Sequence, residues 1–323
     1  MCTAITYKTD DHYFGRTLDL ECSYNESVTV TPRNFKFTFR EGKVICSHYA
    51  IIGMAAVVDG YPLYYEAVNE HGLAMAGLNF PMNAHYFPRC IGKDNIAPFE
   101  FIPWVLSQCK NISDARLLLS KINLCHISFS ENLPLSPLHW IISDNDGAIT
   151  VESVWSGLKI YENNVGVLTN NPSFDYHTTH LCDYMNISPN PAENQFGNID
   201  LVPYSRGMGA MGLPGDVSSA SRFIRAAFIK LNSVSGKSEV ESISQFFHIL
   251  SSVEQQRGCV RLSHDCYEIT QYTSCINTDK CIYYYKTYEN SCVSAVNMYK
   301  CNLDDKELRV YQLEKSQKIN WQN

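Results

Sequence analysis

The chain has 323 residues, of which 45% are hydrophobic and 18% are charged, and its formal net charge is −7. This composition is typical of a globular protein with a sizeable core, and the acidic balance argues against nucleic acid as a partner. No stretch approaches the ~18 consecutive apolar residues of a membrane-spanning helix, so no membrane partner is expected. No linker or repeat divides residues 1–323, which favours a single domain.

The thirteen cysteines are an odd number and include no C-x-x-C pair. Structural zinc sites use short paired spacings, so this pattern does not indicate a metal site. No apolar signal segment is recognised near Met1. We therefore expect reduced thiols and a cytoplasmic location rather than a disulfide framework.

Hydrophobic patterns predict strands in the first part of the chain and helices after them. Apolar runs of strand type cover three segments: Thr3–Tyr7, Ser27–Pro32 and Tyr49–Val58. Helical patterns follow at Ile96–Lys110 and Asp114–Ile122, and Ser113 is the expected N-cap of the second helix.

The second half of the chain repeats this order. Leu138–Ser153 is expected to form a hairpin, and Val165–Thr169 a buried strand. Helices are predicted at Ser219–Leu231 and Val240–Gln255. Strands are then predicted at three segments: Tyr267–Ser274, Cys281–Thr287 and Val310–Leu313. Because strands and helices come in separate runs, layered sheets flanked by helices are favoured over alternating βαβ units.

One glycine motif has the form of a dinucleotide site. Gly207–Gly212 matches G-x-G-x-x-G, which needs an apolar strand before it and a helix that opens at its third glycine. Pro203 stands shortly before the motif and Pro214 shortly after it, which disfavours both elements. We interpret the motif as a loop, and no cofactor is expected.

Cys2 is the most informative residue of the chain. Removal of Met1 would leave a thiol and a free α-amino group on this one residue. Their unperturbed pKa values lie near ~8.5 and ~7.7–8.0, so a nucleophile and a base of matched strength would stand together. A terminal cysteine by itself is more often an ordinary residue, so the interpretation depends on polar residues further along.

Five such residues fit an amide-cleaving site. Arg16 and Asp19 follow a short turn, which places them on a strand beside Cys2, where Arg16 could stabilise a thiolate and Asp19 could hold the α-ammonium. Asn79 and Asn170 each end an apolar strand, where an amide can donate to an oxyanion. Arg222 lies in the first turn of a predicted helix, where the macrodipole disfavours a cation, so a polar or anionic partner is expected.

Together these residues resemble the choloylglycine hydrolase family of N-terminal nucleophile hydrolases, and most closely its bile salt hydrolase branch. The matching motifs extend over nearly the whole chain: Met1–Thr3, Phe14–Asp19, Asn69–Leu73, Gly77–Pro81, Leu168–Pro172, Leu213–Asp216, Ser221–Phe228, Phe246–Leu250 and Gln271–Cys275. The resemblance implies an α+β fold, a four-layer αββα sandwich of two antiparallel sheets flanked by helices. It also implies hydrolysis of an amide by a cysteine nucleophile, and a homotetramer.

The resemblance further implies a nucleophile that also supplies the base, two residues that orient it, two oxyanion donors and a supporting arginine. In that order they are Cys2, Arg16, Asp19, Asn79 through its backbone N–H, Asn170 through its side chain, and Arg222. Related penicillin V acylases often carry tyrosine at the position of Asn79, so glycine- or taurine-conjugated bile acids are the expected substrates. Loops near Tyr61–Tyr65 and Ile127–Pro137 are expected to line the substrate site.

Three alternatives remain open. Within the family, the chain could be a penicillin V acylase or another N-acyl amidase. A bile-acid-binding protein without catalysis would bind the ligand and lose nothing when Cys2 is replaced. A thiol redox protein would need disulfide exchange with a second cysteine, for which no C-x-x-C is present.

Overall fold

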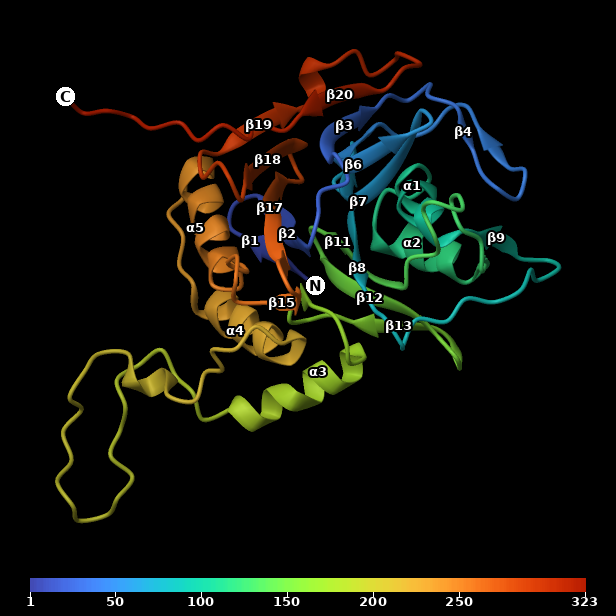
Figure 1. The fold of residues 1–323 in the computed structure, drawn as a ribbon. Helices are drawn as coiled ribbons and strands as arrows, with labels where there is room; N and C mark the ends of the chain where they lie inside the picture. The colour runs from blue at the N-terminus through green and yellow to red at the C-terminus, as the bar shows by residue number, and fades with distance from the viewer.

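Two antiparallel sheets stacked face to face form the centre of the molecule (Figure 1), a computed structural model that describes residues 1–323. The first sheet has six strands in the order β14 (Val167–Leu168), β1 (Cys2–Lys8), β2 (His12–Leu20), β17 (Ile269–Asn277), β18 (Ile282–Thr287) and β19 (Ser294–Asn297). The second has eight, in the order β13 (Gly157–Glu162), β12 (Gly147–Val154), β11 (Leu138–Asp144), β8 (Ala74–Asn79), β7 (Tyr61–Asn69), β6 (Ile51–Val58), β3 (Ser27–Thr31) and β20 (Arg309–Gln312).

Helices cover the outer face of each sheet. Helices α4 (Ser219–Asn232) and α5 (Glu239–Ser251) pack on the six-stranded sheet, whereas α1 (Phe101–Leu106) and α2 (Ile112–Leu119) pack on the eight-stranded sheet (Figure 1). Helix α3 (Phe174–His180) contacts α4. The predicted four-layer αββα sandwich is therefore confirmed.

The remaining elements are short. They are the strand pairs β4 (Phe37–Thr38) with β5 (Val44–Ile45), β9 (Asp94–Ile96) with β10 (Ile122–Leu124), and β15 (Arg261–Ser263) with β16 (Cys266–Tyr267), and four 3-10 turns at Pro98–Glu100, Leu181–Tyr184, Met208–Ala210 and Met298–Lys300. No helix combines the length and the apolar character that crossing a membrane requires.

Both faces of the central strands of the eight-stranded sheet are buried, and β8 shows how its residues are shared between the two layers. Its side chains alternate, so Ala76 and Leu78 join the apolar layer between the sheets. Met75 instead joins the layer beneath α1, where it packs with residues such as Trp104. A strand buried on both faces must be apolar throughout, which explains the continuous apolar runs in the sequence.

Several predicted elements are confirmed with small shifts, but two helix predictions are wrong in detail. The helix expected over Ile96–Lys110 is limited to α1, because Ile96 belongs to β9 and a 3-10 turn precedes the helix. Helix α2 is capped by Asn111 and not by Ser113, since the Asn111 side chain accepts a hydrogen bond from the Asp114 N–H at 2.9 Å.

Two loop interpretations had opposite outcomes. The segment Tyr61–Tyr65 is not a loop but the first half of β7, and Tyr64 is buried in the layer beneath α1. The glycine motif at Gly207–Gly212 is confirmed as a loop, because only the 3-10 turn Met208–Ala210 forms there and no helix opens at Gly212.

Candidate active site

The β1–β2 hairpin places Cys2 at the start of β1, the second strand of the six-stranded sheet. Cys2 lies opposite Leu18 in the register of the two strands, and its side chain is buried. The carbonyl of Met1 accepts a hydrogen bond from the Asp19 N–H at 3.0 Å, which extends the pairing to the first residue. Gly15 keeps β2 close to β17, because a Cβ there would lie 2.1 Å from the carbonyl oxygen of Ser274. The start of the chain is therefore held in a fixed position.

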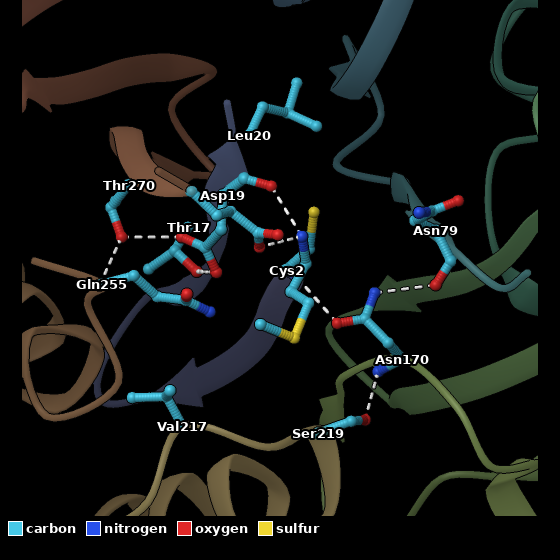
Figure 2. A network of polar contacts seen from close by, with 12 residues as sticks. Cys2, Thr17, Asp19, Leu20, Asn79, Asn170, Val217, Ser219, Gln255 and Thr270 are labelled. Carbon is cyan, nitrogen blue, oxygen red and sulfur yellow. Dashed lines mark hydrogen bonds and ion pairs between the residues drawn. The ribbon is translucent and has the colours of Figure 1, made fainter. Parts of the chain in front are cut away.

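Asn170 makes the most direct side-chain contact with the nucleophile residue (Figure 2). Its Oδ1 accepts a hydrogen bond from the backbone nitrogen of Cys2 at 2.8 Å, and its Nδ2 donates to the carbonyl of Asn79 at 2.7 Å. Its own N–H donates to Ser219 at 2.8 Å, at the start of α4. This one residue thus connects β1, the end of β8 and α4.

Arg222 supports this arrangement from the first turn of α4. The guanidinium is fully buried and donates to the carbonyl of Cys2 and the hydroxyl of Thr3, both at 2.6 Å. It also donates to Oδ1 of Asn170 at 2.7 Å. Burial lowers the pKa of Arg222, and the nearby carboxylate of Asp19 opposes this effect. The position of Arg222 in the first turn of a helix predicted a polar or anionic partner. The observed partners are neutral oxygen atoms.

Arg16 reaches from β2 across the gap between the sheets. It donates to the carbonyls of Gly77 at 2.5 Å and Tyr65 at 3.2 Å, and its Nε lies 3.8 Å from the carboxylate of Glu66. Burial alone would lower the pKa of Arg16, but the thiol of Cys2 and the neighbouring acidic groups raise it overall. A permanent positive charge therefore stands beside the thiol.

Asp19 makes two different contacts, one through its side chain and one through its backbone. Its carboxylate accepts hydrogen bonds from Thr17 at 3.1 Å and Thr270 at 2.7 Å, and burial raises its pKa while Arg222 opposes this. The ammonium of Met1 donates instead to the backbone carbonyl of Asp19, at 2.7 Å, and to the carboxylate of Glu268. With Met1 present, the α-ammonium is thus not held by the Asp19 side chain.

Glu268 is the residue that sequence reasoning missed. It lies directly before β17, is buried, and forms an ion pair with the ammonium of Met1. Its only signal in the sequence is its position just before the matched motif Gln271–Cys275.

Asn79 ends β8 with its backbone amide turned toward the site. The N–H of the next residue, Phe80, donates to the carbonyl of Pro137 at 2.7 Å, and Leu138 lies opposite Asn79 in the register. Hydrogen-bonded and non-hydrogen-bonded pairs alternate along antiparallel strands, so the N–H of Asn79 points away from β11. The carbonyl of Asn79 points to the same side of the strand as its N–H and accepts a hydrogen bond from Asn170. The N–H of Asn79 therefore lies near the Asn170 side-chain amide.

Other titratable residues take no part in this site. His139 is fully buried, stacks on Phe80 with ring centroids 4.1 Å apart, and uses both ring nitrogens, on Glu152 and the carbonyl of Thr169. No group of three or more histidine, cysteine, aspartate or glutamate side chains is arranged to hold a metal ion. The thirteen cysteines form no disulfide. The chemistry available is that of a thiol, two arginines, two amides and carboxylates.

Comparison with known proteins gives consistent matches over the whole chain. The model of the family "Linear amide C-N hydrolases, choloylglycine hydrolase family" matches residues 2–311. A bile salt hydrolase/transferase from Lactiplantibacillus plantarum is 53% identical over 97% of both chains. A crystal structure of a conjugated bile acid hydrolase variant from Clostridium perfringens is similar with a TM-score of 0.93, at 40% identity and 100% coverage of both chains. Penicillin V acylase from Agrobacterium tumefaciens shares the fold, with a TM-score of 0.74 at 21% identity over 96% of this chain and 90% of that one.

Proposed function

Because the chain belongs to the choloylglycine hydrolase family of linear amide C–N hydrolases, we propose that it is a bile salt hydrolase that releases glycine or taurine from conjugated bile acids. The observation that carries the proposal is the contact set of Cys2. Its backbone nitrogen and carbonyl are held by Asn170 and Arg222, while Arg16 provides a positive charge for the thiol. The relative at 53% identity, named for bile salts, supports the substrate class.

The reaction begins when Met1 is absent and Cys2 carries a free amine. The amine takes the proton of the Cys2 thiol, and the sulfur attacks the amide carbonyl of the substrate. The tetrahedral intermediate collapses as the ammonium gives its proton to the leaving amino acid, and a thioester with the bile acyl group remains. Water, deprotonated by the same amine, then attacks the thioester, and the thiol leaves with the free bile acid as the product.

We assign two donors to the oxyanion of both tetrahedral intermediates. The N–H of Asn79 points away from β11, and the Nδ2 of Asn170 lies beside the Asn79 carbonyl. A side-chain amide has two N–H groups, so Asn170 keeps one for the oxyanion while the other donates to Asn79. Preorganised donors of this kind are worth about 2.7–4 kcal/mol each in the transition state.

The segment Ile127–Pro137 is the part of the chain that we assign to the substrate. It leads into β11, and the carbonyl of Pro137 accepts from the N–H of Phe80, the neighbour of Asn79. Apolar residues of this half-exposed segment, such as Phe129 and Leu135, would contact the steroid. Burial of apolar area at roughly 25 cal/mol per Å² makes the steroid the main source of binding energy.

We also propose a homotetramer in the cytoplasm. A long segment between α3 and α4 projects away from the sandwich (Figure 1) and exposes large apolar side chains. They are Phe196, Ile199, Leu201, Val202 and Tyr204, all at least 48% exposed. Exposed apolar patches of this kind mark interaction sites, and contact with other copies would cover them. Thirteen cysteines without a disulfide support a reducing compartment.

The function is tested by turnover of glycocholate and taurocholate, with the free bile acid measured by chromatography. We expect cleavage of both conjugates, no cleavage by Cys2→Ser, and bile-acid binding that survives this substitution. The serine hydroxyl would fit, but the same amine deprotonates it far less readily than a thiol. Binding without turnover in the unmodified enzyme would favour the binding-protein alternative.

A further inference from the structure

A buried carboxylate outside the six expected site residues lies at the start of the chain. Glu268 is 6% exposed, and its side chain has one partner, the ammonium of Met1. The backbone carbonyl of Asp19 accepts from the same ammonium at 2.7 Å. The nitrogen of Met1 is therefore held by two oxygen atoms, one from the charged carboxylate of Glu268 and one from the neutral carbonyl of Asp19.

Removal of Met1 transfers the α-ammonium from Met1 to Cys2, and the new ammonium stays near the Glu268 carboxylate. Backbone nitrogens of consecutive residues are at most ~3.7 Å apart, given the standard N–Cα, Cα–C and C–N bond lengths. The new ammonium on Cys2 therefore forms within ~6 Å of the Glu268 carboxylate, a distance at which opposite charges shift each other's titration. Glu268 would otherwise be left buried without a donor, which costs free energy.

We infer that Glu268 is a positioning residue for the α-amino group of Cys2, which it attracts in the charged form, directly or through one water molecule. This inference rests on the proposed function, in which that amino group is the base. In the enzyme without Met1, Glu268 therefore sets the lower end of the pH range in which Cys2 reacts.

The other charged groups around Cys2 are already engaged. Asp19, from β2, uses its carboxylate oxygens for two threonine hydroxyls. Arg16, also from β2, and Arg222, from α4, are cations that favour the neutral amine and the thiolate. The carboxylates of Asp19 and Glu268 oppose them, and Glu268 is the one whose side chain contacts the chain-end ammonium. Burial raises the pKa of Glu268, and the chain-end ammonium opposes that rise.

The test is the pH dependence of kcat/KM for glycocholate in Glu268→Gln, compared with the unmodified enzyme, both without Met1. Loss of the negative charge lowers the pKa of the amine and of the thiol alike, so the sign does not depend on which group loses its proton. We expect the acid limb to move down by about 1 pH unit. Glu100→Gln is the matched control, because Glu100 is also buried but accepts from the N–H groups of Ala97 and Arg40.

Glu268→Asp keeps the charge and should move the acid limb by less than half as much. If Glu268→Gln does not fold in a thermal melt, Glu268→Met, which also removes the charge, takes its place. An acid limb that stays in place in a folded variant without the charge would overturn the inference. The pH profile of Cys2 alkylation by iodoacetamide must show the same shift, and it needs no bile salt. An enzyme that cleaves neither conjugate, yet shows the alkylation shift, would contradict the proposed function alone.

Discussion

The side-chain oxygen of Asn170 accepts a hydrogen bond from the backbone nitrogen of Cys2 at 2.8 Å. The nitrogen of the same amide donates to the carbonyl of Asn79, so one side chain contacts both Cys2 and the strand end that carries the second proposed oxyanion donor. The two sheets meet at this point, because Cys2 belongs to β1 and Asn79 to β8. The separation between Cys2 and the proposed oxyanion donors therefore depends on Asn170, which lies two residues beyond the end of β14 and contacts both sheets.

Asn170→Ala should lower kcat by about 10²–10³ and change KM much less, because it removes one oxyanion donor. Steady-state kinetics with glycocholate measures both constants. A change confined to KM would mean that Asn170 only positions the substrate.

Asn79→Ala is the matched variant and should have a mild effect. The proposed donor at this position is the backbone N–H, which remains after the side chain is truncated. A loss of kcat as large as that of Asn170→Ala would assign the donor to the Asn79 side chain instead.

Arg222→Lys should reduce both stability and activity. Lysine cannot serve the carbonyl of Cys2 and Oδ1 of Asn170 together, and leaving these buried acceptors unsatisfied costs ~1–3 kcal/mol of unfolding free energy. Displacement of Asn170 should lower kcat by about tenfold. Arg225→Lys, one turn along α4, is the control for denaturant unfolding and turnover, because Arg225 donates to Ser252 and Pro214, outside the site. Equal losses of stability and turnover in the two variants would contradict the role of Arg222 in the site.

Stability should fall as the pH is lowered below 6.5, partly through His177. Burial lowers the pKa of His177 to about 4, while its Nε2 lies 2.9 Å from the carbonyl of Asn170 and donates to it. The unfolded chain therefore binds a proton between pH 6.5 and 4 that the folded chain does not, so stability is lost on acidification in this window. The loss is at most ~1.4 kcal/mol per pH unit.

His177→Gln can keep the hydrogen bond and lacks the titration. The difference in unfolding free energy between pH 7 and pH 5 should shrink by up to ~2 kcal/mol in this variant. The exposed His126→Gln is the control and should leave the difference unchanged. An unaltered difference in His177→Gln would show that other groups cause the acid sensitivity.

Conjugated bile acids should be cleaved at least about tenfold faster than penicillin V, compared as kcat/KM. This ratio corresponds to ~1.4 kcal/mol of transition-state stabilisation. Asparagine at position 79, in place of the tyrosine typical of the acylases, motivates the expectation. Faster hydrolysis of penicillin V would make the substrate assignment wrong, and the assignment of Cys2 would stand.

The layered fold could be predicted from the sequence because the central strands of both sheets are buried on two faces. The apolar run in β6 forms a strand, and β11 and β12 form the hairpin predicted over Leu138–Ser153. Segments that depend on tertiary contacts could not be predicted in the same way. Helix α3 has only seven residues and is held by contacts with α4, and the aromatic residues at the start of β7 have the composition of either a strand or a loop.

The site shows the same division. Cys2, Arg16 and Asp19 are neighbours in one hairpin, so their proximity follows from the β1–β2 pairing. Asn170 and Glu268 reach Cys2 from distant parts of the chain. Asn170 could be recognised because it ends an apolar strand, but nothing local marks a single glutamate as the partner of the first residue.

Intact-mass analysis joined to turnover tests the central claim, that Cys2 with a free α-amino group is both nucleophile and base. In the chain that retains Met1, the nitrogen of Cys2 is an amide that donates to Asn170 and cannot accept a proton. We expect that the active fraction has lost one methionine and no more, and that a preparation with Met1 is inactive on glycocholate. Full activity in protein that still carries Met1 would contradict the account.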